Sequence, residues 1–87
     1  MTLCRHDAQL EAAVARVPRL SNRELEVLMA LPSGHTNGAL AHRLCMTERT
    51  LRAHIGQILI KLDVEGRVRA AVVAFAWQNC CREKMIR

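Results

Sequence analysis

Hydrophobic residues recur along the chain at intervals of three and four, the spacing of amphipathic helices, and no segment alternates as a β-strand does. The clearest stripe predicts a helix over 48–62. Weaker stripes predict helices over 3–17, between Ser21 and Pro32, and over 37–44. A last segment, 66–79, is rich in Ala and Val and apolar on most of its circumference. The pattern predicts an all-α fold, and the stripe of the longest helix consists of Leu51, Ile55, Ile58, Leu59 and Leu62.

Cap residues mark where these helices begin and end. Ser21, with Glu24 three positions later, forms a capping-box pattern, and Thr36 and Thr47 stand where the next two helices begin. Asp63 follows the longest helix and is a residue type that tolerates the left-handed conformation. These boundaries divide the chain into an N-terminal helix or extension (1–19), a helical domain (20–79) and a basic tail (80–87).

The most informative feature is the pair of helices at 37–44 and 48–62, joined by a tight turn around Cys45 and Met46. This is the helix-turn-helix arrangement (unit about 37–56), whose second helix enters the major groove of DNA. Arginine pairs with guanine and glutamine with adenine, while small residues let a helix approach the bases closely. The face opposite the apolar stripe carries the residues that we predict to read bases: Arg49, Arg52, Ala53, Gly56 and Gln57.

A polar face opposite an apolar one is typical of any surface helix, so an ordinary helical bundle competes with DNA binding on periodicity alone. Charge favours DNA. The 87 residues include 13 Lys/Arg and 8 Asp/Glu, a net charge of +5, and residues 42–69 hold six Lys/Arg against three Asp/Glu. Such a balance indicates a polyanionic partner. Aromatic residues make up only 2% of the chain, which argues against base stacking on single-stranded RNA.

Other classes of protein fit the sequence poorly. The four cysteines, at positions 4, 45, 80 and 81, lack the spacing of a disulfide framework, and no signal-like stretch precedes them. The longest apolar run, 70–77, is shorter than the ~20 residues of a membrane span. We therefore expect a reduced, cytoplasmic, nucleoid-associated protein without membrane contact. Cys4 with His6, or His42 with Cys45, lacks the second half of a zinc site, so no metal, cofactor or small-molecule ligand is expected.

Catalytic patterns are also missing from the sequence. It holds only two serines, no pair of carboxylates on one inward face and no glycine-rich phosphate loop. We therefore expect a binding protein that is not an enzyme.

From Leu20 to about Ala76, the chain resembles the LuxR/NarL/FixJ-type (GerE-like) helix-turn-helix domain of bacterial transcription regulators. The resemblance implies four helices, dimerisation largely through the last of them, and binding of promoter DNA at paired half-sites. The predicted helix over 3–17 is an addition to that domain. The residues that carry the resemblance form a long ordered series: 20–28, Gly34, Asn37, Ala41, Leu44, 46–52, His54, Ile58, Lys61, Leu62, Val64, Arg67, Ala70 and Ala71.

The resemblance also implies roles for single residues. The family's base-reading positions fall on Arg52, Ala53 and Gly56. Arg67 either touches phosphate or holds the last helix through an acidic partner. With Arg67 included, the positions implied to contact phosphate are Asn37, Thr47, Thr50, Lys61 and Arg67.

The chain departs from the family pattern at several positions that face DNA. Gly38 and Ala39 replace a usual polar or charged pair, Gly56 replaces a polar or basic residue, and Ile60 replaces a commonly basic one. Asp63 stands at a common glycine. These departures leave open a second function: a protein-interaction module with a helix-turn-helix fold and a partly decayed DNA face, acting on another regulator.

The last predicted helix needs a partner, because a helix that is apolar nearly all round must be covered on two sides. A symmetric homodimer is the simplest solution. The alternative is that the segment 3–17 folds back over this helix within one chain. Promoter DNA, a second copy of the chain, and RNA polymerase or another regulator are thus the expected partners. The expected dimer interface consists of Val68, Val72, Phe75 and Ala76.

Overall fold

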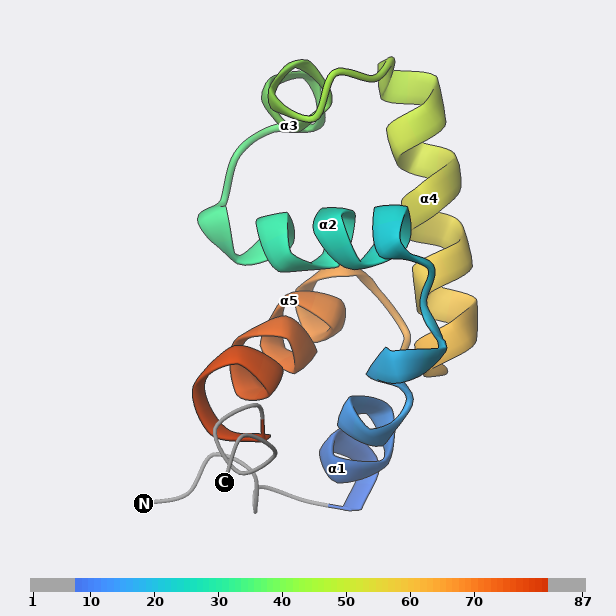
Figure 1. The fold of residues 1–87 in the computed structure, drawn as a ribbon, viewed down its shortest axis with the longest axis vertical. Helices are drawn as coiled ribbons and strands as arrows, with labels where there is room; N and C mark the ends of the chain where they lie inside the picture. The colour runs from blue at the N-terminus through green and yellow to red at the C-terminus, as the bar shows by residue number, and fades with distance from the viewer. Residues whose placement is uncertain (1–7, 82–87) are drawn as a thin grey trace.

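A computed structural model of the chain describes residues 8–81, and every regular element among them is a helix. In Figure 1, α4 runs along one side of the molecule, α2 crosses the middle, and α3 lies at the opposite end from α1. The predicted all-α class is confirmed, with α3 and α4 as the helix-turn-helix pair and α1 as the additional helix. The bounds are α1 (Ala8–Ala15), α2 (Asn22–Ala30), α3 (Asn37–Arg43), α4 (Glu48–Leu62) and α5 (Arg67–Ala76), with 3-10 turns at Val17–Arg19 and Leu31–Ser33 and a π-helical turn at Trp77–Cys81.

Helix α1 belongs to the same core as the rest of the chain. Its residues Leu10, Ala13 and Val14 are buried, as is Val17 in the 3-10 turn that follows. The helix contacts α5, and Arg69 on α5 donates a hydrogen bond to Gln9 Oε1 over 3.3 Å. The alternative considered from the sequence, in which the segment 3–17 folds back over the last helix, is therefore observed for residues 8–17 on one side of α5.

Helix α2 begins with the predicted capping box. The Glu24 amide donates to Ser21 Oγ (3.1 Å), and the Ser21 amide donates to Glu24 Oε1 (3.0 Å). These two bonds satisfy amides that the first turn of a helix leaves without partners. The helix ends at Ala30, and Gly34 adopts a left-handed φ of 79° after the following 3-10 turn. The chain is thereby redirected toward α3.

Helix α4 ends at Leu62, as predicted. Asp63 adopts the left-handed conformation, with φ 58°, and its amide bonds back to the carbonyl groups of the last turn. The side chain of Arg16 donates to the Leu62 carbonyl over 3.0 Å. A cation at a helix C-terminus is favourable because the last carbonyl groups carry partial negative charge. The segment after α1 therefore helps to close the end of α4.

Helix α5 is the central element of the lower half of the molecule, where it contacts α1, α2, α4 and the 3-10 turn at Leu31–Ser33 (Figure 1). Its inward side is built mostly of alanine, which lets neighbouring helices approach closely. The buried residues of this side are Ala70, Val73, Ala74 and Ala76.

Two predicted helices differ in extent from the observed ones. The helix predicted over 66–79 ends at Ala76 and continues as the wider turn Trp77–Cys81, where the Asn79 side chain donates to the Phe75 carbonyl over 2.9 Å. The first residues of the predicted helix 3–17, the pair Cys4 and His6, and most of the basic tail lie outside the described residues. Cys45, in the turn before α4, is a free, exposed thiol.

Candidate nucleic-acid interface

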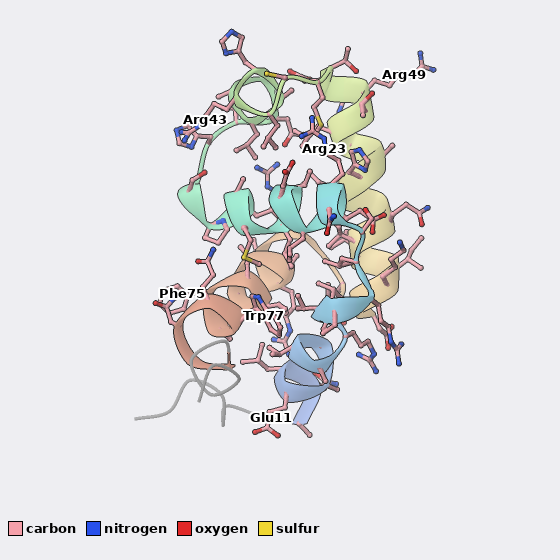
Figure 2. The ribbon with its side chains drawn as sticks, viewed as in Figure 1. Glu11, Arg23, Arg43, Arg49, Phe75 and Trp77 are labelled. Atoms are coloured by element: carbon pink, nitrogen blue, oxygen red, sulfur yellow. The ribbon has the colours of Figure 1, made fainter. Side chains whose placement is uncertain are left out.

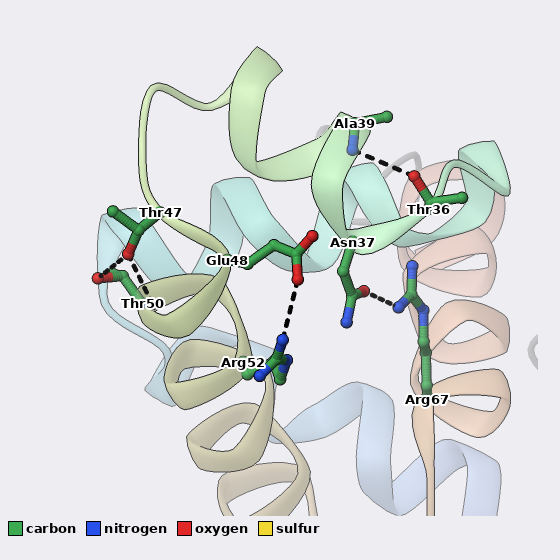
Figure 3. Close-up of polar contacts among 8 residues, drawn as sticks. All are labelled: Thr36, Asn37, Ala39, Thr47, Glu48, Thr50, Arg52 and Arg67. Carbon is green, nitrogen blue, oxygen red and sulfur yellow. Dashed lines mark hydrogen bonds and ion pairs between the residues drawn. The ribbon is translucent and has the colours of Figure 1, made fainter.

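Two threonines fix the start of each helix in the helix-turn-helix pair. Thr36 Oγ1 accepts from the Ala39 amide (3.2 Å), and Thr47 Oγ1 accepts from the Thr50 amide (3.1 Å), as Figure 3 shows. The Thr47 hydroxyl also donates to Thr50 Oγ1 over 3.0 Å. Both predicted caps are confirmed. Between the helices the chain turns at Cys45, which has a left-handed φ of 59°.

The apolar stripe of α4 packs α4 against the rest of the molecule. Leu51, Ile55, Ile58 and Leu62 are buried, whereas Leu59 is only partly buried. Leu40 and Ala41 of α3 are buried in the same core, and α3 contacts α4. The helix pair is thus held by one apolar seam, which leaves the opposite side of α4 to solvent.

The opposite side of α4 carries the residues predicted to read bases. Arg49, Arg52, Ala53 and Gln57 are exposed and Gly56 is half-buried. Arg49 projects from the end of the molecule farthest from α1 (Figure 2). A Cβ atom added at Gly56 would meet no described heavy atom within 4 Å, so packing does not demand a glycine there. The structure brings these five residues onto one accessible helix face.

Arg52 has a partner within α4. Its Nη2 lies 2.9 Å from Oε1 of Glu48, one turn earlier, and both side chains remain largely in solvent. Glu48 is the first residue of the helix, where a carboxylate is favoured by the helix dipole. The pair therefore stabilises the first turn of α4 and gives the Arg52 guanidinium a preferred direction (Figure 3).

Arg67 connects the start of α5 to the start of α3. Its guanidinium donates to Asn37 Oδ1 and, over 3.0 Å, to the His35 carbonyl. Because the amide oxygen of Asn37 faces a group that can only donate, the amide nitrogen is left to face other partners. The acidic partner considered for Arg67 is absent from these contacts, and the role seen instead is a brace between α5 and α3.

A second polar cluster lies in the segment before α3. His35 Nδ1 lies 2.8 Å from Ser33 Oγ, and His35 Nε2 lies 3.2 Å from Arg43 Nη1. The Ser33 hydroxyl donates to the Ala30 carbonyl (2.7 Å), so it accepts from His35, whose Nε2 then accepts from Arg43. The sequence does not predict this cluster, because no local pattern indicates that the side chain of Arg43, at the end of α3, contacts His35 before the start of α3.

A sequence profile described as "Bacterial regulatory proteins, luxR family" matches residues 18–74, well over half of the chain. The chain belongs to the luxR family of bacterial regulatory proteins. The matched segment contains the helix-turn-helix pair, both threonine caps and most of α5. The family is one of DNA-binding transcription regulators and is not an enzyme family, as the sequence predicted.

Curated relatives of this luxR-family chain are regulators. It is 46% identical over 55 residues to the transcriptional regulatory protein LiaR of Bacillus subtilis, an alignment that covers 63% of the chain and 26% of LiaR. It is 36% identical over 56 residues to the response regulator protein VraR of Staphylococcus aureus, covering 64% of the chain and 27% of VraR. The chain spans about a quarter of the length of these relatives. No solved structure matches it significantly.

Lys61 of this luxR-family chain, which the resemblance assigns to phosphate, forms an ion pair within the protein. Its Nζ lies 2.8 Å from Glu24 Oε1, which also accepts from the Ser21 amide. The bond from Lys61 is the largest cause that lowers the pKa of the Glu24 carboxyl, the bond from the Ser21 backbone is the next, and burial opposes them. Lys61 therefore pairs with a buried carboxylate and joins α4 to the start of α2. The capping role predicted for Glu24 is confirmed.

The outward side of α5 in this luxR-family chain keeps three large apolar residues in solvent. Val68 is 79% exposed, Val72 44% and Phe75 48%, and Phe75 points away from the body of the molecule (Figure 2). Ala76 is only 2% exposed and belongs to the core, so its predicted place in a dimer interface is wrong. The helix turns by about 100° per residue, which carries residue 76 to the side facing the core.

Within residues 8–81, no group of three or more His, Cys, Asp or Glu side chains is placed to hold a metal ion. None of the helices in this part of the luxR-family chain combines the length and apolar character of a membrane span.

Proposed function

We propose that this chain binds double-stranded promoter DNA sequence-specifically, as the effector domain of a bacterial transcription regulator acting in the cytoplasm at the nucleoid, with α4 in the major groove. The observation that carries the proposal is the two-sided character of α4. Its apolar side is buried, while Arg49, Arg52 and Gln57 stand on the accessible side. These three side chains supply donors for base edges.

The neighbouring residues suit the same role. Exposed Ala53 and half-buried Gly56 present little bulk, so base edges can approach the helix backbone closely. Thr47 and Thr50 place hydroxyl groups at the positive end of the α4 dipole, where phosphate is favoured. Asn37, held by Arg67, has its amide nitrogen available for a phosphate oxygen. Lys61 is left out of the proposed interface because it pairs with Glu24.

We also propose that two copies pair through α5. The exposed side chains of Val68, Val72 and Phe75 form a stripe along this helix. A groove beside it is lined by Leu31, Pro32, Ala71 and neighbouring residues. A symmetric dimer would bury the stripe and direct two copies of α4 to half-sites about one helical turn of DNA apart.

Binding to DNA is tested by selecting sequences from a random library and titrating the recovered site at several salt concentrations. We expect an inverted repeat and an affinity that falls steeply with salt, because phosphate contacts release counterions. Arg52→Ala is expected to lose about 1–3 kcal/mol of binding free energy and to relax preference at one base pair. Equal binding by Arg52→Ala and the wild-type chain would refute the assignment of Arg52 to base reading.

A second function, contact with another regulator or with RNA polymerase, is favoured by one observation. Ile60 lies on the accessible side of α4, near the C-terminal end of the helix, and is 70% exposed. A basic residue at this position would suit DNA binding better. The same selection separates the two functions. If no DNA sequence is enriched, and the affinity for DNA does not change with salt concentration, the protein-interaction function is favoured.

A further inference from the structure

We propose that Glu48 is a specificity-determining residue, which holds the Arg52 guanidinium in the direction that suits guanine and disfavours its pairing with phosphate. The inference rests on the proposed function. Its first basis is the ion pair itself, in which Glu48 Oε1 lies 2.9 Å from Arg52 Nη2 on the face assigned to DNA (Figure 3).

The second basis is Gly38, in the first turn of α3. A Cβ atom at this position would lie 2.9 Å from Glu48 Oε2, closer than non-bonded atoms normally approach. The contrast with Gly56 is clear, because a Cβ there would meet no described atom within 4 Å. The Glu48 oxygen is the far end of a flexible, exposed side chain, so an alanine at position 38 would displace the carboxylate at little cost, whereas glycine leaves it beside Arg52 as observed.

The hydrogen-bonding capacity of the three groups is compatible. A guanidinium carries five N–H donors, and the guanine edge takes two of them through O6 and N7. A donor on Nη2 remains for Glu48. The carboxylate thus accepts from one guanidinium donor without competing with guanine. It also restricts the conformations that the long Arg52 side chain adopts before DNA binds.

The charge of Glu48 also acts on affinity. A carboxylate at the DNA face is repelled by phosphates, so it weakens binding to every sequence. Because this repulsion is common to all sequences, it lowers every affinity and cancels from their ratio. Specificity depends instead on the direction in which Glu48 holds the Arg52 guanidinium, since guanine offers that group two acceptors. Glu48 is therefore expected to separate these two quantities.

The test begins by finding the base pair that Arg52 reads, which is the position whose preference disappears when sequences are selected with Arg52→Ala. Affinities are then measured for the preferred site, for its three single-base variants at that position, and for unrelated DNA. The proteins compared are wild type, Glu48→Gln, Glu48→Asp, Gly38→Ala and, as a matched control, Glu26→Gln. Glu26 forms a similar exposed pair with Arg23, three residues earlier on α2 (2.7 Å).

Glu48→Gln is expected to bind unrelated DNA more tightly, by roughly two- to fivefold, because one repelling charge is removed. Its discrimination at the Arg52 base pair is expected to fall by about three- to tenfold, part of the roughly 5- to 150-fold that a bidentate arginine contributes. Glu48→Asp keeps the charge but is one methylene shorter, so discrimination falls while affinity for unrelated DNA stays near wild type. Gly38→Ala moves the carboxylate and is expected to behave like Glu48→Asp.

The control variant Glu26→Gln is expected to leave discrimination unchanged. If Glu48→Gln keeps the wild-type discrimination while the wild-type chain selects a clear site, the Glu48–Arg52 pair serves helix stability alone and this inference is overturned, although the proposed function stands. If the wild-type chain selects no site, the proposed function fails and the inference fails with it.

Discussion

The C-terminal half of α4 is built into the core, whereas the N-terminal half stands beside α3 with most of its side chains in solvent. In the C-terminal half, Ile55, Ile58 and Leu62 are buried, and Lys61 and the Leu62 carbonyl bond to side chains of distant segments. In the N-terminal half, Leu51 is buried, and the polar contacts of Thr47 and Glu48 reach one turn along the same helix. The C-terminal half therefore fixes the position of the helix, and the N-terminal half leaves hydrogen-bond donors free for a ligand.

The largest effect that tests this contrast is expected from a single isoleucine. Ile58→Ala removes a fully buried side chain and is expected to lower the free energy of unfolding by about 2–5 kcal/mol, through lost burial and a residual cavity. Urea unfolding followed by circular dichroism measures the change. The matched control is Ile60→Ala, two residues away and 70% exposed, for which we expect a change within about 0.5 kcal/mol. Equal losses would show that the exposed side is packed and would break the comparison.

The next effect concerns the pairing of Lys61 with Glu24. Lys61→Met leaves the Glu24 carboxylate nearly buried without its largest stabilising partner, and we expect a loss of about 1–2 kcal/mol at neutral pH, with the partial exposure of Lys61 taken into account. Glu26→Gln, which breaks the exposed pair with Arg23, is the control and is expected to change stability little.

The same variant has a defined pH dependence. Because the folded pKa of Glu24 is lowered, the pair stabilises the fold fully above the ordinary glutamate pKa, and this contribution is lost as the pH falls through the lowered value. In Lys61→Met the pKa of Glu24 rises, so the free energy of unfolding falls less steeply as the pH is lowered. The free energies of unfolding of the variant and the wild type therefore converge at low pH. A difference that persists unchanged into acid would contradict the ionic origin of the effect.

The smallest effect is expected at Gly56, on the exposed side of α4. Alanine meets no described atom there, so Gly56→Ala is expected to raise the free energy of unfolding by ~1 kcal/mol through helix propensity alone. Gly34→Ala is the matched opposite, since Gly34 has a φ of 79° that disfavours any other residue, and it is expected to destabilise the fold. Thermal unfolding of both variants measures whether stability rises in Gly56→Ala and falls in Gly34→Ala. A loss of stability in Gly56→Ala would mean that this side of the helix is covered.

What the sequence predicted well depends on neighbours along the chain. Ser21 with Glu24, Thr36, Thr47 and the left-handed Asp63 act within one helical turn, so their roles are visible in the order of residues. The apolar stripe of α4 and the accessible face opposite it follow from the helical period. The bounds of α4 were therefore predicted as observed.

What the sequence could not supply depends on distant segments. Lys61 meets Glu24 across 37 positions and Arg67 meets Asn37 across 30. The sequence alone shows neither partner, so it predicts a phosphate contact for Lys61 and either a phosphate contact or an acidic partner for Arg67. The sequence predicts Ala76 in an interface because the composition of the last helix does not show which of its sides faces the core. The room that Gly38 gives to Glu48 likewise requires the packing of α3 beside α4.

The contact between α1 and α5 has a consequence for how the chain folds. Gln9 and Arg69 are 60 positions apart, so the core is complete only when nearly the whole described chain has been brought together. The α3–α4 pair, in contrast, joins segments that are adjacent in sequence. Contacts between sequence neighbours form faster than contacts that close a long loop, and the entropy of closure must be overcome before the distant contact stabilises the fold. We therefore expect α3 and α4 to pair early and the contact between α1 and α5 to form last.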